Sequence, residues 1–372
     1  MYLALRELRA ARGRFLLMGS VVMLVAALVG IVSGFTAGLG NDTVSALRAL
    51  PATHLVFSAD AKSDQFNRSL VGADVLDAWR AEPGVEAAPL GVAITRGTTN
   101  RGVEIDLAAF GVEPGSFVAP DPDSGQPVGT TPGGIVVSRK LADKGVHVGD
   151  MLTIDRLGTA VRVDGITGSA SYGHVPAAYV PLDVWTRLRF GIPGADPNAT
   201  LPRQFSAVAV RASGSAALPI DRLDAAKGTH TISRGASFAA APGYSGERVT
   251  MNSIQVFLYL IAPLVVGAFF AVWTVQRGPE LALLRAMGAS RPRLLWITAV
   301  QAAIVVAAGA VAGGAVAAGV GLLLGSAVPF SLPPLTLVAT LGGVAALGLA
   351  GTAITLRRVT APDPLTMLGA HR

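Results

Sequence analysis

Long uncharged apolar runs dominate both ends of the sequence. Residues 15–37 contain no charged side chain over 23 positions. As a helix this run would be about 35 Å long, which is enough to cross the ~30 Å hydrocarbon core of a bilayer. Residues 253–276 form a second run, and the polar Asn252 and Gln255 mark its beginning. Each of these runs predicts one transmembrane helix.

The third apolar run is too long for a single helix. Residues 294–356 carry no charge over 63 positions. Within this run, residues 326–334 (SAVPFSLPP) contain three prolines, which remove backbone donors and fix φ, so this segment predicts an outer loop. The whole chain is then expected to form four transmembrane helices, at residues 15–37, 253–276, 294–325 and 335–356.

Residues 38–252 alternate short strand-like and helix-like segments. The strand-like segments are HLVFSAD, VEIDLAAFGV, GIVV, MLTI, AVRVDGI, AAYV, FSAVAVRA and HTISR, and the longer helix-like ones are GADVLDAWRAEPGV and PLDVWTRLRF. Ser138 is a candidate N-cap of a short helix after GIVV, and Asn41 is a candidate N-cap of NDTVSALRAL, an extension of the first helix.

The Pro/Gly-rich residues 113–134 form a predicted loop of 22 residues, too long and polar for a core element. With the alternating segments around it, this pattern predicts a mixed α/β (α+β) domain of roughly 200 residues, large enough for a core of its own. The domain is inserted between helices 1 and 2.

Lys and Arg in the short flanks predict the orientation. Residues 1–14, 277–293 and 357–372 hold 11 basic and three acidic residues, a net charge of +8, whereas residues 38–252 have a net charge of −2. Basic flanks stay in the cytoplasm. Both termini and the 277–293 segment are therefore expected to be cytoplasmic, with residues 38–252 extracytoplasmic, in a multi-pass protein of a bacterial plasma membrane.

A cleaved signal peptide is the competing interpretation of the N-terminal region. Its apolar run of 23 residues is longer than the ~7–15 residues of a signal peptide core, and no clean small-residue cleavage site follows it. We therefore expect an uncleaved anchor.

Composition and charge fit this membrane assignment. The chain of 372 residues is 51% apolar and only 15% charged, and its lack of cysteine excludes a disulfide framework or a thiolate metal site. The isoelectric point near 10.0 follows from the cytoplasmic flanks, so it does not predict a nucleic-acid partner.

Motifs for catalysis are missing from the sequence. There is no phosphate-binding GxxxxGK[ST] loop, and the five histidines show no metal-ligand spacing, so each is read as an ordinary surface or loop residue. Ser171, His174 and Asp183 resemble a hydrolase set only in composition, because no GxSxG elbow accompanies them. We expect no catalytic residues, no metal site and no intrinsic cofactor.

The segment 277–293 (RGPELALLRAMGASRPR) interrupts the apolar sequence with a short predicted helix. Pro279 suits the first helical position, and Glu280 lies near the positive end of the helix dipole. One face carries apolar and small residues, namely Leu281, Leu283, Leu284, Met287 and Gly288, with Arg285 on the other. A solvated loop with anchoring arginines is the alternative, but the apolar face favours a docking site for a partner.

This segment and the span after it resemble those of a known protein family. ELALLRAMGAS followed by a Gly/Ala-rich span is similar to the signature of FtsX/MacB-type ABC transporter permeases. In that family this segment couples the permease to a cytoplasmic ATPase, which implies a coupling role for Glu280, Leu281, Leu284, Arg285, Met287 and Gly288. The resemblance covers nearly the whole chain. It implies that ATP is bound by the partner subunit.

A narrower resemblance lies nearer the N-terminus. MYLALRELRAARGRFLLMG and SGFTAGLGNDTVSALRALPATHLVFSADA are similar to the DevC/haem-exporter (HrtB-like) permease branch. Members of that branch pair with a separate ATPase subunit and are thought to expel haem or other hydrophobic molecules. The resemblance therefore implies haem as a possible cargo.

Glycines recur every four residues in the outer half of the first span, at Gly30, Gly34 and Gly38. Such spacing permits close approach of another helix. We expect a packing face, within a homodimer, although glycine is also common in alanine-rich spans. Gly309/Gly313 and Gly321/Gly325 repeat the spacing in the third span.

Tyr259 in the second span and Met251 just before it are candidates for holding a haem cargo. Met251 and Tyr259 lie about two helical turns apart, and a Met sulfur or Tyr oxygen can ligate haem iron. A tyrosine at this depth is more often part of an interfacial aromatic belt.

Three functions are compatible with these features. The first is the permease subunit of an exporter that couples ATP hydrolysis by a separate subunit to extrusion of haem or a similar hydrophobic or amphipathic molecule. The second is mechanotransmission, in which no cargo crosses and the outer domain switches a cell-wall hydrolase. The third is extraction of a lipid or lipoprotein. An ATPase partner, contact with membrane lipid and no nucleic acid are expected for all three.

Overall fold

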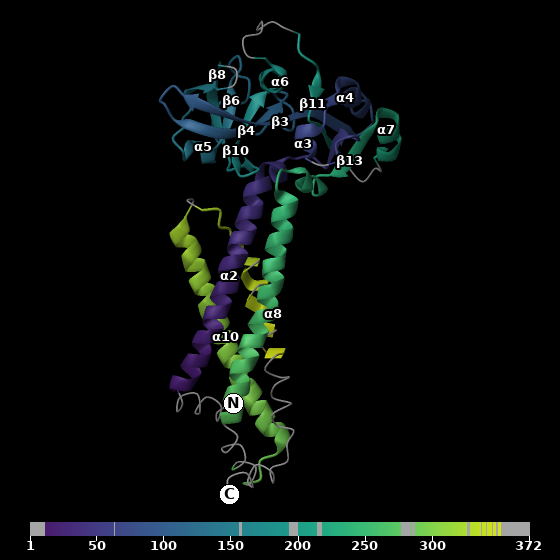
Figure 1. The fold of residues 1–372 in the computed structure, drawn as a ribbon. Coiled ribbons are helices and arrows are strands. Elements are labelled where there is room, and N and C mark those ends of the chain that lie inside the picture. Colours follow the sequence, from purple (N-terminus) through teal and green to yellow (C-terminus); the bar gives the residue numbers. More distant parts are fainter. Residues whose placement is uncertain are drawn as a thin grey trace. The chain divides into compact units, whose positions relative to one another are not determined.

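In a computed structural model, the protein divides into two compact units (Figure 1). Unit 1 comprises Met1–Leu39 and Val249–Arg372, and unit 2 comprises Gly40–Arg248. The structure describes residues 12–62, 64–155, 158–192, 200–213, 218–276, 283, 287–325, 328–335, 337–339, 341–343, 345–346 and 349–350.

Unit 1 is helical. It contains most of the long helices α2 (Arg12–Ala49) and α8 (Tyr244–Gln276) and all of α10 (Arg291–Leu324). The unit boundary falls inside α2 and α8. All three are long and apolar enough to cross a membrane. The third predicted span, 294–325, agrees closely with α10. The first two helices extend past the predicted span limits of 37 and 253, because helical hydrogen bonding continues where the apolar run stops.

Asn41 does not cap a helix. The backbone of α2 is continuously helical from Arg12 to Ala49, so Asn41 lies in the helix interior. Its side-chain oxygen accepts a hydrogen bond from Arg48, at 3.2 Å. The N-cap prediction for this residue is therefore wrong, since a capping residue needs a helix that begins there.

The chain leaves the helical conformation after α10, as the three prolines predict. The described residues 328–333 are non-helical, and the described residues from 334 to 350 are helical. Ala345 and Leu349 pack against the apolar cluster of the long helices. A fourth span at 335–356 stays a prediction, because residues 351–372 and several positions before them lie outside the described part of the chain.

An apolar cluster joins the three long helices of unit 1. Phe15 of α2 meets Trp273 of α8 edge to face, with ring centroids 5.5 Å apart. Val306 of α10 is buried in the same cluster. Gly313 of α10 lies against the backbone of α2 at Met23, where an added β-carbon would overlap the carbonyl oxygen. Small residues therefore let these helices approach closely.

Unit 2 is an α/β domain built on one large mixed sheet. The strands are β1 (His54–Ser58), β2 (Val71–Gly72), β3 (Val85–Thr99), β4 (Glu104–Val112), β5 (Ser124–Gly125), β6 (Ile135–Ser138), β7 (Met151–Ile154), β8 (Thr159–Thr167), β9 (Ser171–Tyr172), β10 (Val175–Pro181), β11 (Gln204–Phe205), β12 (Ala207–Ala212) and β13 (Thr229–Ser233). The helical elements are α3 (Gln65–Arg68), α4 (Ala73–Arg80), α5 (Arg139–Ala142), α6 (Leu182–Phe190), α7 (Ile220–Lys227) and the 3-10 helix η1 (Ala236–Ala240).

The main path of the sheet runs β13-β1-β12-β3-β4-β10-β6-β8-β5. Strand β10 pairs in parallel with β4, and β6 pairs in parallel with β8, while the other pairs are antiparallel. A separate two-stranded sheet joins β11 to β2. This topology confirms the predicted mixed α/β architecture.

Both faces of the central strands are buried. In β4, Phe110 and Val112 face one apolar cluster, whereas Leu107 and Ala109 face another. Trp185 of α6 lies over the β3–β4 pair at Gly91 and Gly111, which are register partners and leave room for the indole ring because they have no side chain.

The segments predicted as strands and helices in this domain are found as such, and Ser138 caps α5 by accepting a hydrogen bond from the Lys140 amide. No element is predicted from the sequence at β3, the longest strand. Six consecutive residues of this strand, from Ala87 to Val92, are buried. Because both faces are covered, β3 lacks the polar–apolar alternation that marks a half-exposed strand.

The 113–134 segment is more than a polar loop. Its Val118 and Val128 are buried in the core cluster, 2% and 4% exposed, and β5 within it pairs with β8. Asp164 of β8, with a side chain 2% exposed, fastens the segment by accepting hydrogen bonds from the amide and the hydroxyl of Thr131, at 2.9 and 2.8 Å. The prediction of a loop too polar for a core element therefore needs correction, because the segment supplies two buried valines to the core, and composition does not reveal such tertiary contacts.

Replacing Asp164 with alanine should release the 113–134 segment, because the Thr131 amide would lose its buried acceptor at a cost of about 1–3 kcal/mol. Hydrogen exchange of the full chain in lipid nanodiscs would show faster exchange in residues 126–134. Asp123→Ala is the matched control, since its ion pair with Arg139 is exposed and contributes about 0–1 kcal/mol. Unchanged exchange in Asp164→Ala would show that the segment is held by its apolar residues instead.

Candidate functional site

The predicted coupling segment is described only in part. Glu280, Leu281, Leu284 and Arg285 lie outside the described residues. Leu283 is helical, and its carbonyl accepts a hydrogen bond from the Met287 amide at 3.0 Å. Gly288 follows with φ +98°, a conformation that glycine adopts easily at the end of a helix. The side chains of Leu283 and Met287 are 65% and 68% exposed. These two apolar residues, one turn apart, are available for a partner.

The glycines of α2 lie against other parts of the same chain. A β-carbon on Gly30 would lie 2.8 Å from that of Ala317 in α10, and one on Gly34 would overlap the ring of Phe330. Gly38 lies against the backbone of Pro329. These glycines are covered within the chain, so a homodimer, which stays a prediction, would have to use another surface.

Phe330 fills the space that the missing side chain of Gly34 leaves on α2. Its ring occupies the space beside Gly34 and beside Gly321 of α10, and it meets Phe35 edge to face with centroids 5.3 Å apart. The neighbouring Ser331 amide donates a hydrogen bond to the Gly34 carbonyl, at 3.0 Å. The segment after α10 is thus fastened to α2 by both a side chain and its backbone.

The two candidate cargo residues occupy different settings on α8. The Met251 sulfur accepts a weak hydrogen bond from the Thr36 hydroxyl of α2, at 3.8 Å. Tyr259 is half-buried and packs on the small cluster of Ala26, Val29 and Ala310. Both lie on one helix, and each contacts a neighbouring helix of unit 1.

Within unit 2, the ends of α2 and α8 meet around His174, in the turn between β9 and β10. The Nδ1 atom lies 3.2 Å from the Asp42 carboxylate of α2, and Nε2 lies 2.8 Å from the Glu247 carboxylate of α8. The Thr43 hydroxyl donates to Glu247 at 3.0 Å, and Lys140 forms an ion pair with Asp42.

The surroundings of His174 favour its charged form. Burial alone lowers the pKa of this imidazole, but the hydrogen bonds and negative charges of Glu247 and Asp42 outweigh burial, so its pKa is raised above the ordinary value of 6.5. This histidine is not the ordinary loop residue expected from the sequence. Its partners lie 132 and 73 positions away, so no local motif could have revealed them.

The hydrolase set considered from composition does not assemble. Asp183 lies on α6 with a side chain 65% exposed and is 3.9 Å from Arg187, whereas His174 contacts Asp42 and Glu247. Ser171 is buried at the start of the hairpin, where its amide donates to the Ser45 hydroxyl at 2.8 Å. His174 and Ser171 thus contact the ends of α2 and α8, and Asp183 does not join them.

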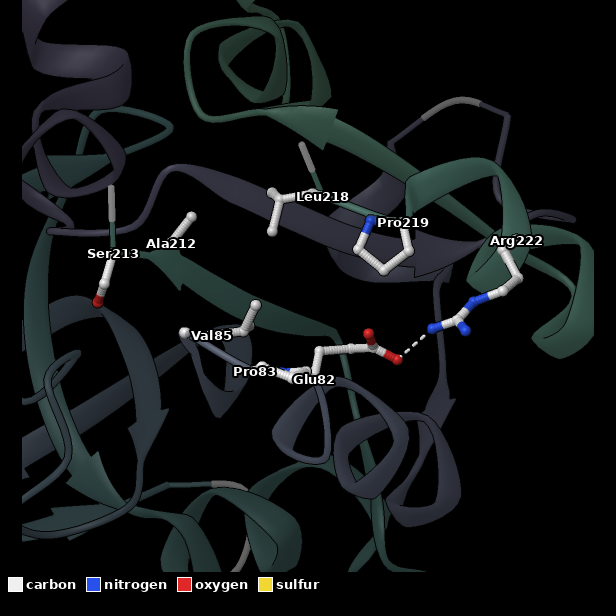
Figure 2. Close-up of a pocket in the computed structure, with 9 residues that line it drawn as sticks. Glu82, Pro83, Val85, Ala212, Ser213, Leu218, Pro219 and Arg222 are labelled. Atoms are coloured by element: carbon white, nitrogen blue, oxygen red, sulfur yellow. Dashed lines mark hydrogen bonds and ion pairs between the residues drawn. The ribbon is translucent and has the colours of Figure 1, made fainter. Parts of the chain in front are cut away.

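A cleft in unit 2 is lined by Glu82, Pro83, Gly84, Val85, Ala212, Ser213, Leu218, Pro219 and Arg222 (Figure 2). Its volume is about 360 Å3. Glu82 and Arg222 form an ion pair across one side, as the dashed line in Figure 2 shows. Among the described lining residues these are the only two charged side chains, and each is neutralised by the other.

Comparison with known proteins finds a family match for the C-terminal part of the chain. Residues 252–364 match the FtsX-like permease C-terminal family. This segment contains α10 and most of α8, two of the three candidate spans. This part of the chain thus matches an FtsX-like permease domain.

The chain is also homologous, at low identity, to a protein named as a hemin transport system permease protein, HrtB, of Staphylococcus epidermidis. The two are 23% identical over 372 residues, which is 99% of each chain. The extracellular domain of YknZ from Gram-positive bacteria is 12% identical, with TM-score 0.34 over 49% of this chain and 99% of that one. The periplasmic region of MacB from Actinobacillus actinomycetemcomitans is 10% identical, with TM-score 0.35 over 52% and 92%.

Substituting Gly34 with alanine should destabilise unit 1 by about 1–3 kcal/mol, because the new methyl group would collide with Phe330. In the double variant Gly34→Ala/Phe330→Ala the two losses should be non-additive by ~0.5–3 kcal/mol, since the collision is removed. Thermal unfolding of the full chain in nanodiscs measures both effects.

Gly19→Ala is the matched control on the same helix, because an added β-carbon at Gly19 would have no atom within 4 Å, so alanine there should be neutral or stabilising by about 0.5–1 kcal/mol. Strictly additive losses at Gly34 and Phe330 would show that the two residues are not in contact.

Proposed function

We propose that this chain is the membrane subunit of an ABC-type exporter, and that a separate ATPase subunit drives extrusion of haem or a similar hydrophobic or amphipathic molecule. The carrying observation is the match to a hemin transport permease, which extends over 99% of both chains. The exposed Leu283 and Met287 support the coupling role, and the basic flanks support cytoplasmic termini.

The proposed coupling route begins at the segment 279–288. A partner ATPase that grips this segment would act on α8 before it and α10 after it. These helices pack on α2 through the buried cluster of Phe15, Trp273 and Val306. Closely packed helices move as bodies, so a push at the segment changes the spacing of the spans. In this proposal the chain binds no ATP itself, consistent with the missing phosphate-binding loop.

Haem titration of the purified permease–ATPase complex tests the cargo. We expect a saturable Soret shift together with a change in ATPase rate. No shift and no ATPase response would reject haem. In that case, stimulation of the ATPase by lipid would support an extractor, and stimulation by a secreted cell-wall hydrolase would support mechanotransmission.

The same titration locates the ligand. Tyr259 is the candidate, because its phenol oxygen can bind haem iron and it lies on the helix that contacts α2 in unit 1. Tyr259→Phe should abolish the Soret shift, whereas Tyr244→Phe, a substitution of the same kind at the start of the same helix, should preserve it. An unaltered spectrum in Tyr259→Phe would remove this residue from the cargo site.

A charge on the exposed apolar face should uncouple the ATPase. In Met287→Asp, a carboxylate replaces a side chain that is 68% exposed, and we expect at least about a tenfold loss of ATPase co-purification, equivalent to ~1.4 kcal/mol. Ser290→Asp introduces the same charge three residues later, at the N-cap of α10, where aspartate is well tolerated. Equal binding of the ATPase by both variants would reject a docking role for Met287.

A further inference from the structure

The ends of α2 and α8 in unit 2 are held in different ways. On α2, Val44 and Leu47 are fully buried in the main core cluster. On α8, Tyr244 packs against that cluster only in part, and the Glu247 side chain is 31% exposed. Apolar burial therefore fixes the end of α2 firmly, whereas the end of α8 depends more on its polar contacts.

His174 supplies the central polar contact. Its two ring nitrogens face two carboxylates from different helices, Asp42 on α2 and Glu247 on α8. A protonated imidazole donates from both nitrogens, so only the charged ring can bond both acids at once. When the ring is neutral, one nitrogen has no proton to donate and the two acids lose the cation between them.

The backbone at this position is unusual for histidine. Gly173 and His174 form the two-residue turn between paired Tyr172 and Val175, and both have positive φ, +57° and +65°. Such a hairpin turn favours glycine or asparagine at both positions. A histidine is held here in a left-handed conformation although glycine would meet the turn without strain, and strain of this kind accompanies functional positions.

We infer that protonated His174 is a clasp that holds the beginning of α8 against α2 in unit 2, and that loss of its proton releases α8. His174 is thus a positioning residue for the helices that continue into the predicted membrane spans. The inference deepens the proposed function, because the motion of α8 is the step on which that proposed coupling rests.

The remaining charged groups at the site determine how the His174 contact depends on pH. Lys140 forms an ion pair with Asp42. Glu247 accepts hydrogen bonds from the Thr43 hydroxyl and from His174. After deprotonation Glu247 keeps only the hydroxyl among these partners and faces Asp42, a charge of the same sign. Since the pKa of His174 is raised in the folded state, the clasp is complete below about pH 6.5 and is lost as pH rises through the higher, folded-state pKa.

The distance between the two helix ends tests the clasp directly. The chain has no cysteine, so Ala49→Cys and Arg248→Cys, both at exposed positions, create two unique attachment points for spin labels. Electron–electron double resonance on the full chain in nanodiscs would compare about pH 6 with about pH 9. We expect one short distance at the lower pH and a second, longer population at the higher pH.

His174→Asn in the same labelled chain is the control, because asparagine tolerates positive φ but does not titrate. It should make the distance distribution independent of pH. Identical distributions at both pH values in the unsubstituted histidine chain would overturn the clasp, as would a pH response that persists in His174→Asn. The unsubstituted chain by itself decides the question if the variant fails to fold.

ATPase stimulation by haem, measured in parallel on the same complex, separates this inference from the proposed function. A pH-independent distance with haem-stimulated ATPase rejects the clasp and leaves the exporter. A pH-dependent distance that His174→Asn abolishes, without any response to haem, supports the clasp and rejects the haem exporter.

Discussion

Close backbone approach at small residues is the constraint on which unit 1 depends. Inside a bilayer, apolar side chains gain little by leaving lipid for one another, so helices associate where their surfaces fit. Gly313 meets the backbone of α2 at Met23, and Gly30 meets Ala317. At Gly34 the missing side chain admits Phe330, whose neighbour Ser331 also bonds the α2 backbone. The glycine spacing on α2 thus serves contacts inside the chain. Other surfaces are left for a second copy or for lipid.

Unit 2 is stabilised in the opposite way, by apolar burial on both faces of a sheet. Alternate residues of β4 enter separate clusters, and Trp185 covers the paired glycines of β3 and β4. Against that apolar background, buried or half-buried charged groups carry specific tasks. Asp164 fastens a long segment to the sheet, and His174 joins the ends of two helices. Each such group must find its partners, because an unpaired charge in a poorly hydrated site is costly.

These two kinds of packing suit the proposed permease function. The apolar helices of unit 1 hold their spacing by fit, and the proposed coupling route relies on this fit to transmit a displacement of the 279–288 segment. In unit 2, the beginning of α8 depends on a titratable contact. A helix with a fixed apolar course and a polar, reversible attachment is suited to switching, since a polar contact can be exchanged for water at small net cost.

The sequence by itself determined the apolar helices, the break at the prolines and the α/β class of the inserted domain, because hydropathy, proline and alternation act over a few neighbouring residues. It also determined the permease resemblance through the motif at 280–290. Only the tertiary structure decided that β3 is a central strand, that Val118 and Val128 belong to the core, and that the α2 glycines receive Phe330. The His174 cluster is the clearest case. Its acids come from positions 42 and 247, and contacts between such distant residues depend on the folded path of the chain, which no local pattern encodes.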